Sequence, residues 1–141
     1  MFRVLCMDVT FMTAEKWMVP DPIQYELLSL SQDAEFPFSG IHLDPLFVGL
    51  QTKCLCYHSM GNVNGMADML ALMNSVITEG TFTTETSYVY LNMFVYCQIK
   101  AGHHRQSVKS ILQSMRNFPS RYNAASGYMK IVFQILNSLL I

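Results

Sequence analysis

Apolar residues recur every three or four positions along most of this chain, which is the spacing of an amphipathic helix. One such segment starts at Asp44-Pro45, where Asp can cap a helix and Pro suits its first turn, and it stops at Met60-Gly61. The same spacing predicts further helices over residues 64–77, 87–100, 106–115 and 123–140. Glycines fall at several of the predicted helix ends, where a left-handed backbone is commonly needed.

The first 43 residues are harder to assign. Asp21-Pro22 predicts another helix start, and the cluster Phe36-Pro37-Phe38-Ser39-Gly40 ends that helix. Within residues 1–18, Leu5, Met7, Val9 and Phe11 alternate as in a strand, whereas Val4, Met7 and Phe11 suit a helix equally well. We favour a helix here because the neighbouring segments are helical.

Two stretches of the chain resemble each other. Aligning residues 56–73 with 96–115 pairs Gly61 with Gly102 and Met73 with Met115, a period of about 41–42 residues. Each unit comprises a helix, a turn containing glycine and a second helix. The predicted fold is therefore all-α, a short α-solenoid of helical hairpins in a single domain over 1–141. Its parts are an N-terminal helical segment (1–43), two hairpins (44–80 and 87–117) and a C-terminal helix (122–141).

The composition indicates that other molecules cover part of this surface. Hydrophobic residues make up 51% of the chain and charged residues 13%, against roughly 25% charged in ordinary soluble proteins. No apolar run reaches the roughly 20 residues that a spanning helix needs, so we expect no membrane span. A solenoid requires polar ends, yet this chain starts with an apolar segment and finishes Leu-Leu-Ile. We therefore expect other protein subunits to cover both ends.

Charge is distributed unevenly along the chain. All ten acidic residues lie at or before Glu85, and only three basic residues oppose them there. The last 56 residues carry six basic residues and no acidic one. Such asymmetry is typical of chains with an anionic partner. The alternative is that the two parts neutralise each other or face charged neighbours in a complex.

The segment YLNMFVYCQIKAG, residues 90–102, carries a family resemblance. Together with the Gly-to-Met second helix of each unit, it resembles the pentatricopeptide repeat (PPR) over about residues 45–117. The resemblance implies helical hairpins like those of the PPR and tetratricopeptide families, and, as in the PPR family, binding to RNA. It also implies an organelle, with the mitochondrion as the expected compartment. In that family the second and fifth residues of the motif contact RNA bases, which here implies Val48 and Gln51, and Val89 and Asn92.

Basic residues in the second helix of the second hairpin suggest a different contact. Arg105, Lys109 and Arg116 fall within about 40° of one another on a helix. Guanidinium and ammonium groups in such a stripe suit phosphates rather than base edges. We therefore predict phosphate contact with a structured RNA, ribosomal RNA in particular. The alternative is a solvated face that happens to be positive.

Other chemistry is poorly supported by the sequence. Cys54 and Cys56 would point about 200° apart on a helix, and only Cys54 and His58 could share a metal ion. No second pair of ligands accompanies them, so we predict no metal site and no cofactor. The chain contains no phosphate-binding glycine loop, nucleophile elbow or HExxH motif. We expect a non-catalytic, RNA-associated subunit of an organellar ribonucleoprotein, such as a mitochondrial ribosome or its assembly machinery. The alternative is a protein-binding scaffold without RNA contact.

Overall fold

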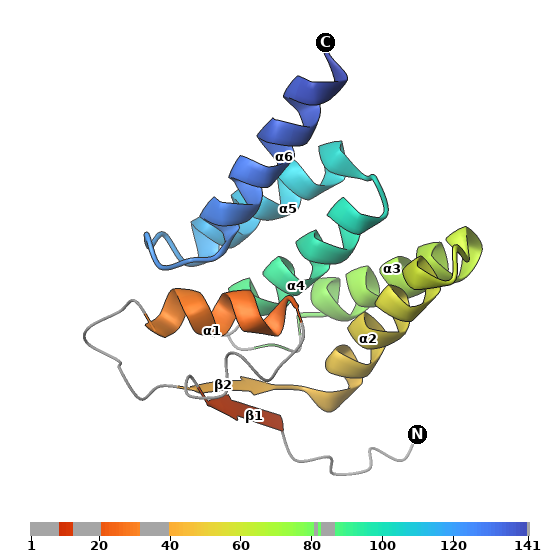
Figure 1. The fold of residues 1–141 in the computed structure, drawn as a ribbon. Coiled ribbons are helices and arrows are strands. Elements are labelled where there is room, and N and C mark those ends of the chain that lie inside the picture. Colours follow the sequence, from red (N-terminus) through yellow and green to blue (C-terminus); the bar gives the residue numbers. More distant parts are fainter. Residues whose placement is uncertain (1–8, 13–20, 32–39, 81, 83–86, 141) are drawn as a thin grey trace.

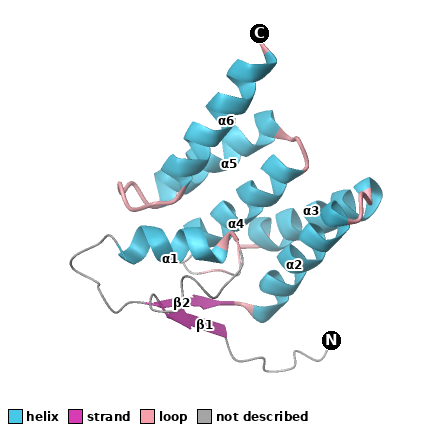
Figure 2. Ribbon diagram, in the orientation of Figure 1, coloured by secondary structure: helices cyan, strands magenta, loops and turns pink. Residues whose placement is uncertain are grey.

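The computed structural model describes residues 9–12, 21–31, 40–80, 82 and 87–140. This part of the chain is all-α, as predicted, with two short strands at one end (Figures 1 and 2). In chain order the elements are β1 (Val9–Met12), α1 (Ile23–Ser31), β2 (Gly40–Leu43), α2 (Pro45–Ser59), α3 (Val63–Thr78), α4 (Ser87–Lys100), α5 (His104–Asn117) and α6 (Ala125–Leu139).

The two predicted hairpins are present. Helices α2 and α3 pack against each other, as do α4 and α5, while α6 packs on α5 and α4 (Figure 1). Asp44 caps α2 by accepting a hydrogen bond from the amide of Leu46 at 2.8 Å. Each hairpin turns at a glycine with positive φ, which is 69° at Gly61 and 78° at Gly102. Both turns therefore use the left-handed backbone that glycine adopts without steric cost.

One prediction for the N-terminal segment is wrong. Residues 9–12 form strand β1 rather than a helix, and β1 pairs antiparallel with β2, with Val9 opposite Leu43 and Met12 opposite Gly40. Along β2, Ile41 and Leu43 are buried whereas His42 is exposed. That alternation gives β2 one buried face, and in the register Val9 and Phe11 of β1 lie opposite Leu43 and Ile41 of that face. The rest of residues 1–18 and the cluster at 36–39 lie outside the described residues.

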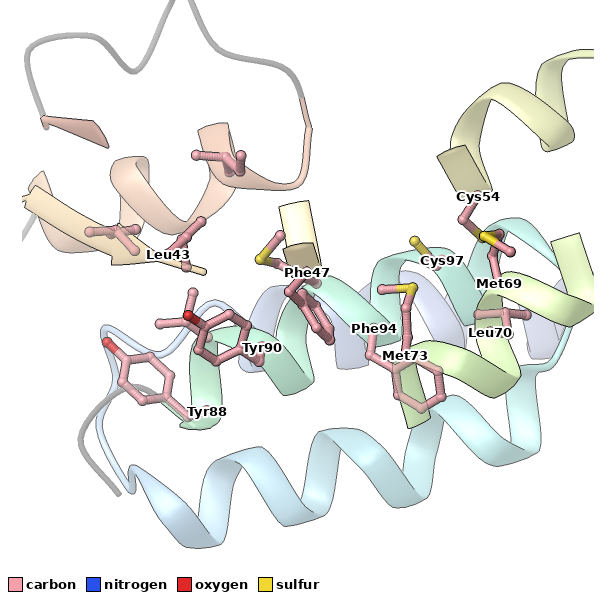
Figure 3. Packing of buried hydrophobic residues seen from close by; sticks show 14 of the residues in the cluster. Leu43, Phe47, Cys54, Met69, Leu70, Met73, Tyr88, Tyr90, Phe94 and Cys97 are labelled. Atoms are coloured by element: carbon pink, nitrogen blue, oxygen red, sulfur yellow. The ribbon is translucent and has the colours of Figure 1, made fainter. Parts of the chain in front are cut away.

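Helix α4 is the centre of the molecule and buries ten of its fourteen residues. It belongs to both hydrophobic clusters, one shared with α1, β2, α2 and α3, the other with α5 and α6. Figure 3 shows the first cluster. In it the ring of Tyr90 lies 4.9 Å from that of Phe47 and stacks on Phe82, and its hydroxyl accepts a hydrogen bond from the amide of Asp44 at 2.7 Å. The first turn of α2 is thereby fixed against α4.

Helix α1 lies across the array of hairpins, close to α4 in Figure 1. At its start the backbone carbonyl of Asp21 accepts a hydrogen bond from Gln51 of α2 at 3.1 Å. The carboxylate of Asp21 accepts another from the hydroxyl of Tyr96 of α4 at 3.2 Å. The ring of Tyr25 contacts the rings of Tyr96 and of Tyr128 of α6. Helix α1 thus touches the first helix of each hairpin and α6.

Candidate nucleic-acid interface

Helix α5 carries the basic stripe that the sequence predicts. Its inner side is set by Ile111, Ser107 and Ser114, all of which are fully buried. Arg105, Lys109 and Arg116 are exposed and lie on the opposite side, about 120–160° around the helix from Ile111. At 1.5 Å per residue the three side chains extend along roughly 16 Å of the helix.

These three cations are available to an anionic partner. Within the part of the chain that the structure describes, none of Arg105, Lys109 and Arg116 pairs with a carboxylate. By contrast, the guanidinium of Arg121 lies 4.8 Å from the ring of Tyr122 and hydrogen-bonds its hydroxyl. The ammonium of Lys100 lies 5.4 Å from the ring of Tyr96. The three residues on α5 therefore form a basic surface, which we call the α5 stripe, and it suits phosphate oxygens.

The implied base-contacting residues do not form a surface. Gln51, Val89 and Asn92 are 1%, 3% and 0% exposed, and Val48 is half-buried. The amide of Gln51 donates to the backbone of Asp21. Gln51, Val89 and Asn92 are thus buried in this arrangement, and internal hydrogen bonds engage the side-chain amides of Gln51 and Asn92. Base contact by these residues stays a prediction.

Asn92 belongs to a buried polar network that joins α4 to the helices after it. Its side-chain amide donates to Asn123 at 2.8 Å, and its side-chain oxygen accepts from the hydroxyl of Ser114 at 2.6 Å. Asn123 also donates to the backbone oxygens of Ser114 and Phe118, and it accepts from the amide of Ala125 in the first turn of α6. The network therefore fixes the connection between α5 and α6 onto α4.

Glu26 of α1 is the one acidic side chain among the described residues that is buried. Burial raises the pKa of its carboxyl to about 8, although a hydrogen bond from Asn92 opposes part of the rise. Burial also raises the pKa of Tyr88 to about 12, with the nearby Glu26 adding to the effect. The pKa of Tyr128 also rises, first because of burial and then because of Glu26, with smaller contributions from Tyr25, Tyr96 and Asp21. The cost of removing a charge from water therefore keeps Glu26 largely protonated at neutral pH.

Sequence reasoning missed Glu26, Ser114 and Asn123. A usable signal was present around Asn92, because residues 88–97 are apolar almost throughout and a helix that is apolar on all sides is buried. A polar residue inside such a helix must find an internal partner. No comparable signal marks Glu26, since its burial depends on where α1 docks.

Two cavities lie between the hairpins. One, of about 190 Å³, lies beside the two glycine turns and is lined by Tyr57, Met66, Leu70, Lys100 and His103 among others. The other, of about 380 Å³, lies toward the opposite ends of the hairpins, near Ile77 and Asn117. No carboxylate of the described residues lines either cavity.

The cysteines and histidines do not assemble a metal centre in the described ranges, where no group of three or more candidate ligands comes together. Cys54 is fully buried, and a hydrogen bond with Cys97 lowers its pKa. His58, the other half of the pair considered from the sequence, is exposed. Cys54 is therefore a core residue.

Comparisons with protein-family models, with curated proteins and with solved structures find no match for this chain. No helix in the described ranges is both long and apolar enough to span a membrane. The assignment of a function therefore depends on the geometry of the surfaces described above.

Proposed function

We propose that this chain is a non-catalytic, RNA-associated helical-repeat subunit of a ribonucleoprotein, and that it contacts phosphates through the α5 stripe. The observation that carries the proposal is the set of three exposed cations on one side of α5, none of which pairs with a carboxylate of the described residues. Charge-assisted hydrogen bonds from such groups to phosphate are strong and carry no sequence information. The partner RNA is accordingly a folded one, bound on its backbone.

Support for this reading also comes from the surrounding surface. The last 56 residues, which include α4, α5 and α6, contain no acidic residue. Lys100, Arg121 and Lys130 are exposed there as well. A polyanion approaching α5 would therefore meet no local repulsion from this part of the chain. The resemblance to the PPR family is the support for an organellar particle, a mitochondrial ribosome or its assembly machinery in particular.

UV crosslinking of the native complex tests the proposal. We expect RNA to crosslink to wild-type protein and the yield to fall strongly when Arg105, Lys109 and Arg116 are all replaced by Glu. The matched control replaces Lys53, Lys100 and Lys130 by Glu, which makes the same change in net charge on α2, α4 and α6. Equal crosslinking of the two triple variants would show that the α5 stripe is not the contact.

A second candidate function is a protein-binding scaffold without RNA contact. It is favoured by apolar side chains at the surface of α6, where Phe133 is 54% exposed and Leu139 70% exposed, and by Leu140 after it, which is 85% exposed. Exposed apolar groups of this kind are typical of protein–protein contacts. Under this alternative, both triple variants would remain in the complex and wild type would give no RNA crosslink.

A further inference from the structure

The side of helix α1 that packs on the rest of the fold carries a carboxylic acid side chain, that of Glu26. Ile23, Glu26 and Leu27 share one side of the helix, and they are 1%, 2% and 0% exposed. A carboxyl group between two core aliphatic side chains is costly to bury in its charged form. The stability of α1 in its docked position therefore depends on whether the carboxyl of Glu26 is protonated or ionised.

The surroundings of Glu26 offer little to stabilise a negative charge. Asn92 of α4 hydrogen-bonds the carboxyl, and the ionisable groups that face it are Tyr88 of α4 and Tyr128 of α6. Neither α2 nor α5 adds a charged group to those that act on the carboxyl, and no lysine, arginine or histidine of the described residues does so. An ionised Glu26 would therefore lie in the interior without a counter-ion from the described residues.

The same interface contains further unsatisfied polar atoms. Oε1 of Glu26 has no hydrogen-bond partner among the described residues, and neither does Oε1 of Gln51 or the hydroxyl of Tyr128. Each buried polar atom without a partner lowers the stability of the state that buries it. Docking of α1 is thus supported by apolar contacts and opposed by these polar atoms, as expected of an element that opens locally before the rest of the fold.

We propose that α1 is a pH-sensitive cover, closed over α4 and α6 when Glu26 is protonated and released as Glu26 ionises. Release breaks the hydrogen bond from Gln51 of α2 to the backbone of Asp21 and the one between Asn92 of α4 and Glu26. The inference depends only on the docking of α1 and stands whether or not the partner is RNA.

The direction of the pH effect follows from the two states of the carboxyl. In the closed state the pKa of Glu26 is about 8, whereas in the open state it returns to the ordinary value of 4.5. The closed form is therefore fully favoured below about pH 4.5. It loses stability as the pH rises from there to the closed-state pKa of Glu26, about 8. Between these limits the opening equilibrium constant rises about tenfold for each pH unit, and it levels off above pH 8.

Hydrogen exchange of the backbone amides in α1, corrected for intrinsic exchange rates, measures this opening. In wild-type protein we expect protection of residues 23–31 to fall steadily from pH 6 to pH 8 and to change little by pH 9. Glu26→Gln keeps the shape of the side chain and removes its ionisation, so its protection should be independent of pH. Glu79→Gln, at an exposed position after α3, is the matched control and should behave as wild type.

Glu26→Met repeats the test without a buried amide, in case Gln disturbs the packing. Protection of α1 that falls with pH in wild type, and stays constant in both Glu26 variants, supports the cover. Protection that has the same pH dependence in wild type and in the Glu26 variants overturns the proposal. So does an α1 that exchanges at the intrinsic rate at pH 6.

Discussion

Asn123 joins three elements through a single side chain. It donates to the backbone oxygens of Ser114 and Phe118, accepts from the amide of Ala125, and pairs with Asn92. Replacing Asn123 by Ala leaves several of these buried groups without a partner. We expect the free energy of unfolding to fall by about 2–3 kcal/mol, measured by urea denaturation.

The control for this substitution is Asn74→Ala, on an exposed side of α3. Surface substitutions of this kind change stability by about 0.5 kcal/mol or less. Equal effects of the two substitutions would contradict a stabilising role for the network around Asn92.

At the candidate interface, the exposure of the α5 stripe was predictable from the sequence, whereas the burial of Gln51, Val89 and Asn92 was not. Helical spacing alone places Arg105, Lys109 and Arg116 on one side, and long charged side chains are seldom buried. Gln51 and Asn92 have the polarity of surface residues, but an amide is also accepted in a core if internal partners exist. Whether partners exist depends on α1 and on Asn123, which are distant in sequence.

The positive φ of Gly102 makes the turn between α4 and α5 sensitive to substitution. Its φ of 78° is strained for any residue with a Cβ atom. Gly102→Ala should therefore lower the free energy of unfolding by about 1–2 kcal/mol, as measured by chemical denaturation. The hairpin of α4 and α5 should be the part that loosens.

Gly49→Ala serves as the opposite case in the same measurement. Gly49 lies within α2, and an added Cβ would meet no atom within 4 Å. Alanine should stabilise the helix there by about 0.5–1 kcal/mol. A destabilised Gly49→Ala, or an unaffected Gly102→Ala, would contradict the turn geometry described here.

Element boundaries were predictable where a local signal exists. Asp44, Gly61 and Gly102 mark helix ends because capping and positive φ are local requirements, and the structure places α2 and α4 at the predicted bounds. Strands β1 and β2 required pairing across about thirty residues, which no local pattern encodes. The docking of α1 on α4 is equally non-local.

At the scale of the whole molecule, charge and burial divide the chain into two parts. Residues 86–141 carry six basic residues and no acidic one, and they include the α5 stripe. The acidic residues lie earlier, with Glu26 inside the fold. If the α5 stripe binds RNA as we propose, this uneven distribution of charge along the chain would favour approach of the polyanion to the C-terminal part.

The dependence of RNA affinity on salt tests the central claim, phosphate contact through the α5 stripe, most directly. The measurement is the Kd of purified protein for a double-stranded RNA hairpin across a series of KCl concentrations. Because each phosphate contact releases counter-ions, wild-type affinity should fall steeply with salt. Replacing Arg105, Lys109 and Arg116 by Glu should reduce the log–log slope by about two to three. The triple variant with Lys53, Lys100 and Lys130 replaced by Glu should reduce the log–log slope by less. A wild-type affinity that is independent of salt, or equal slopes for both triple variants, would contradict the claim.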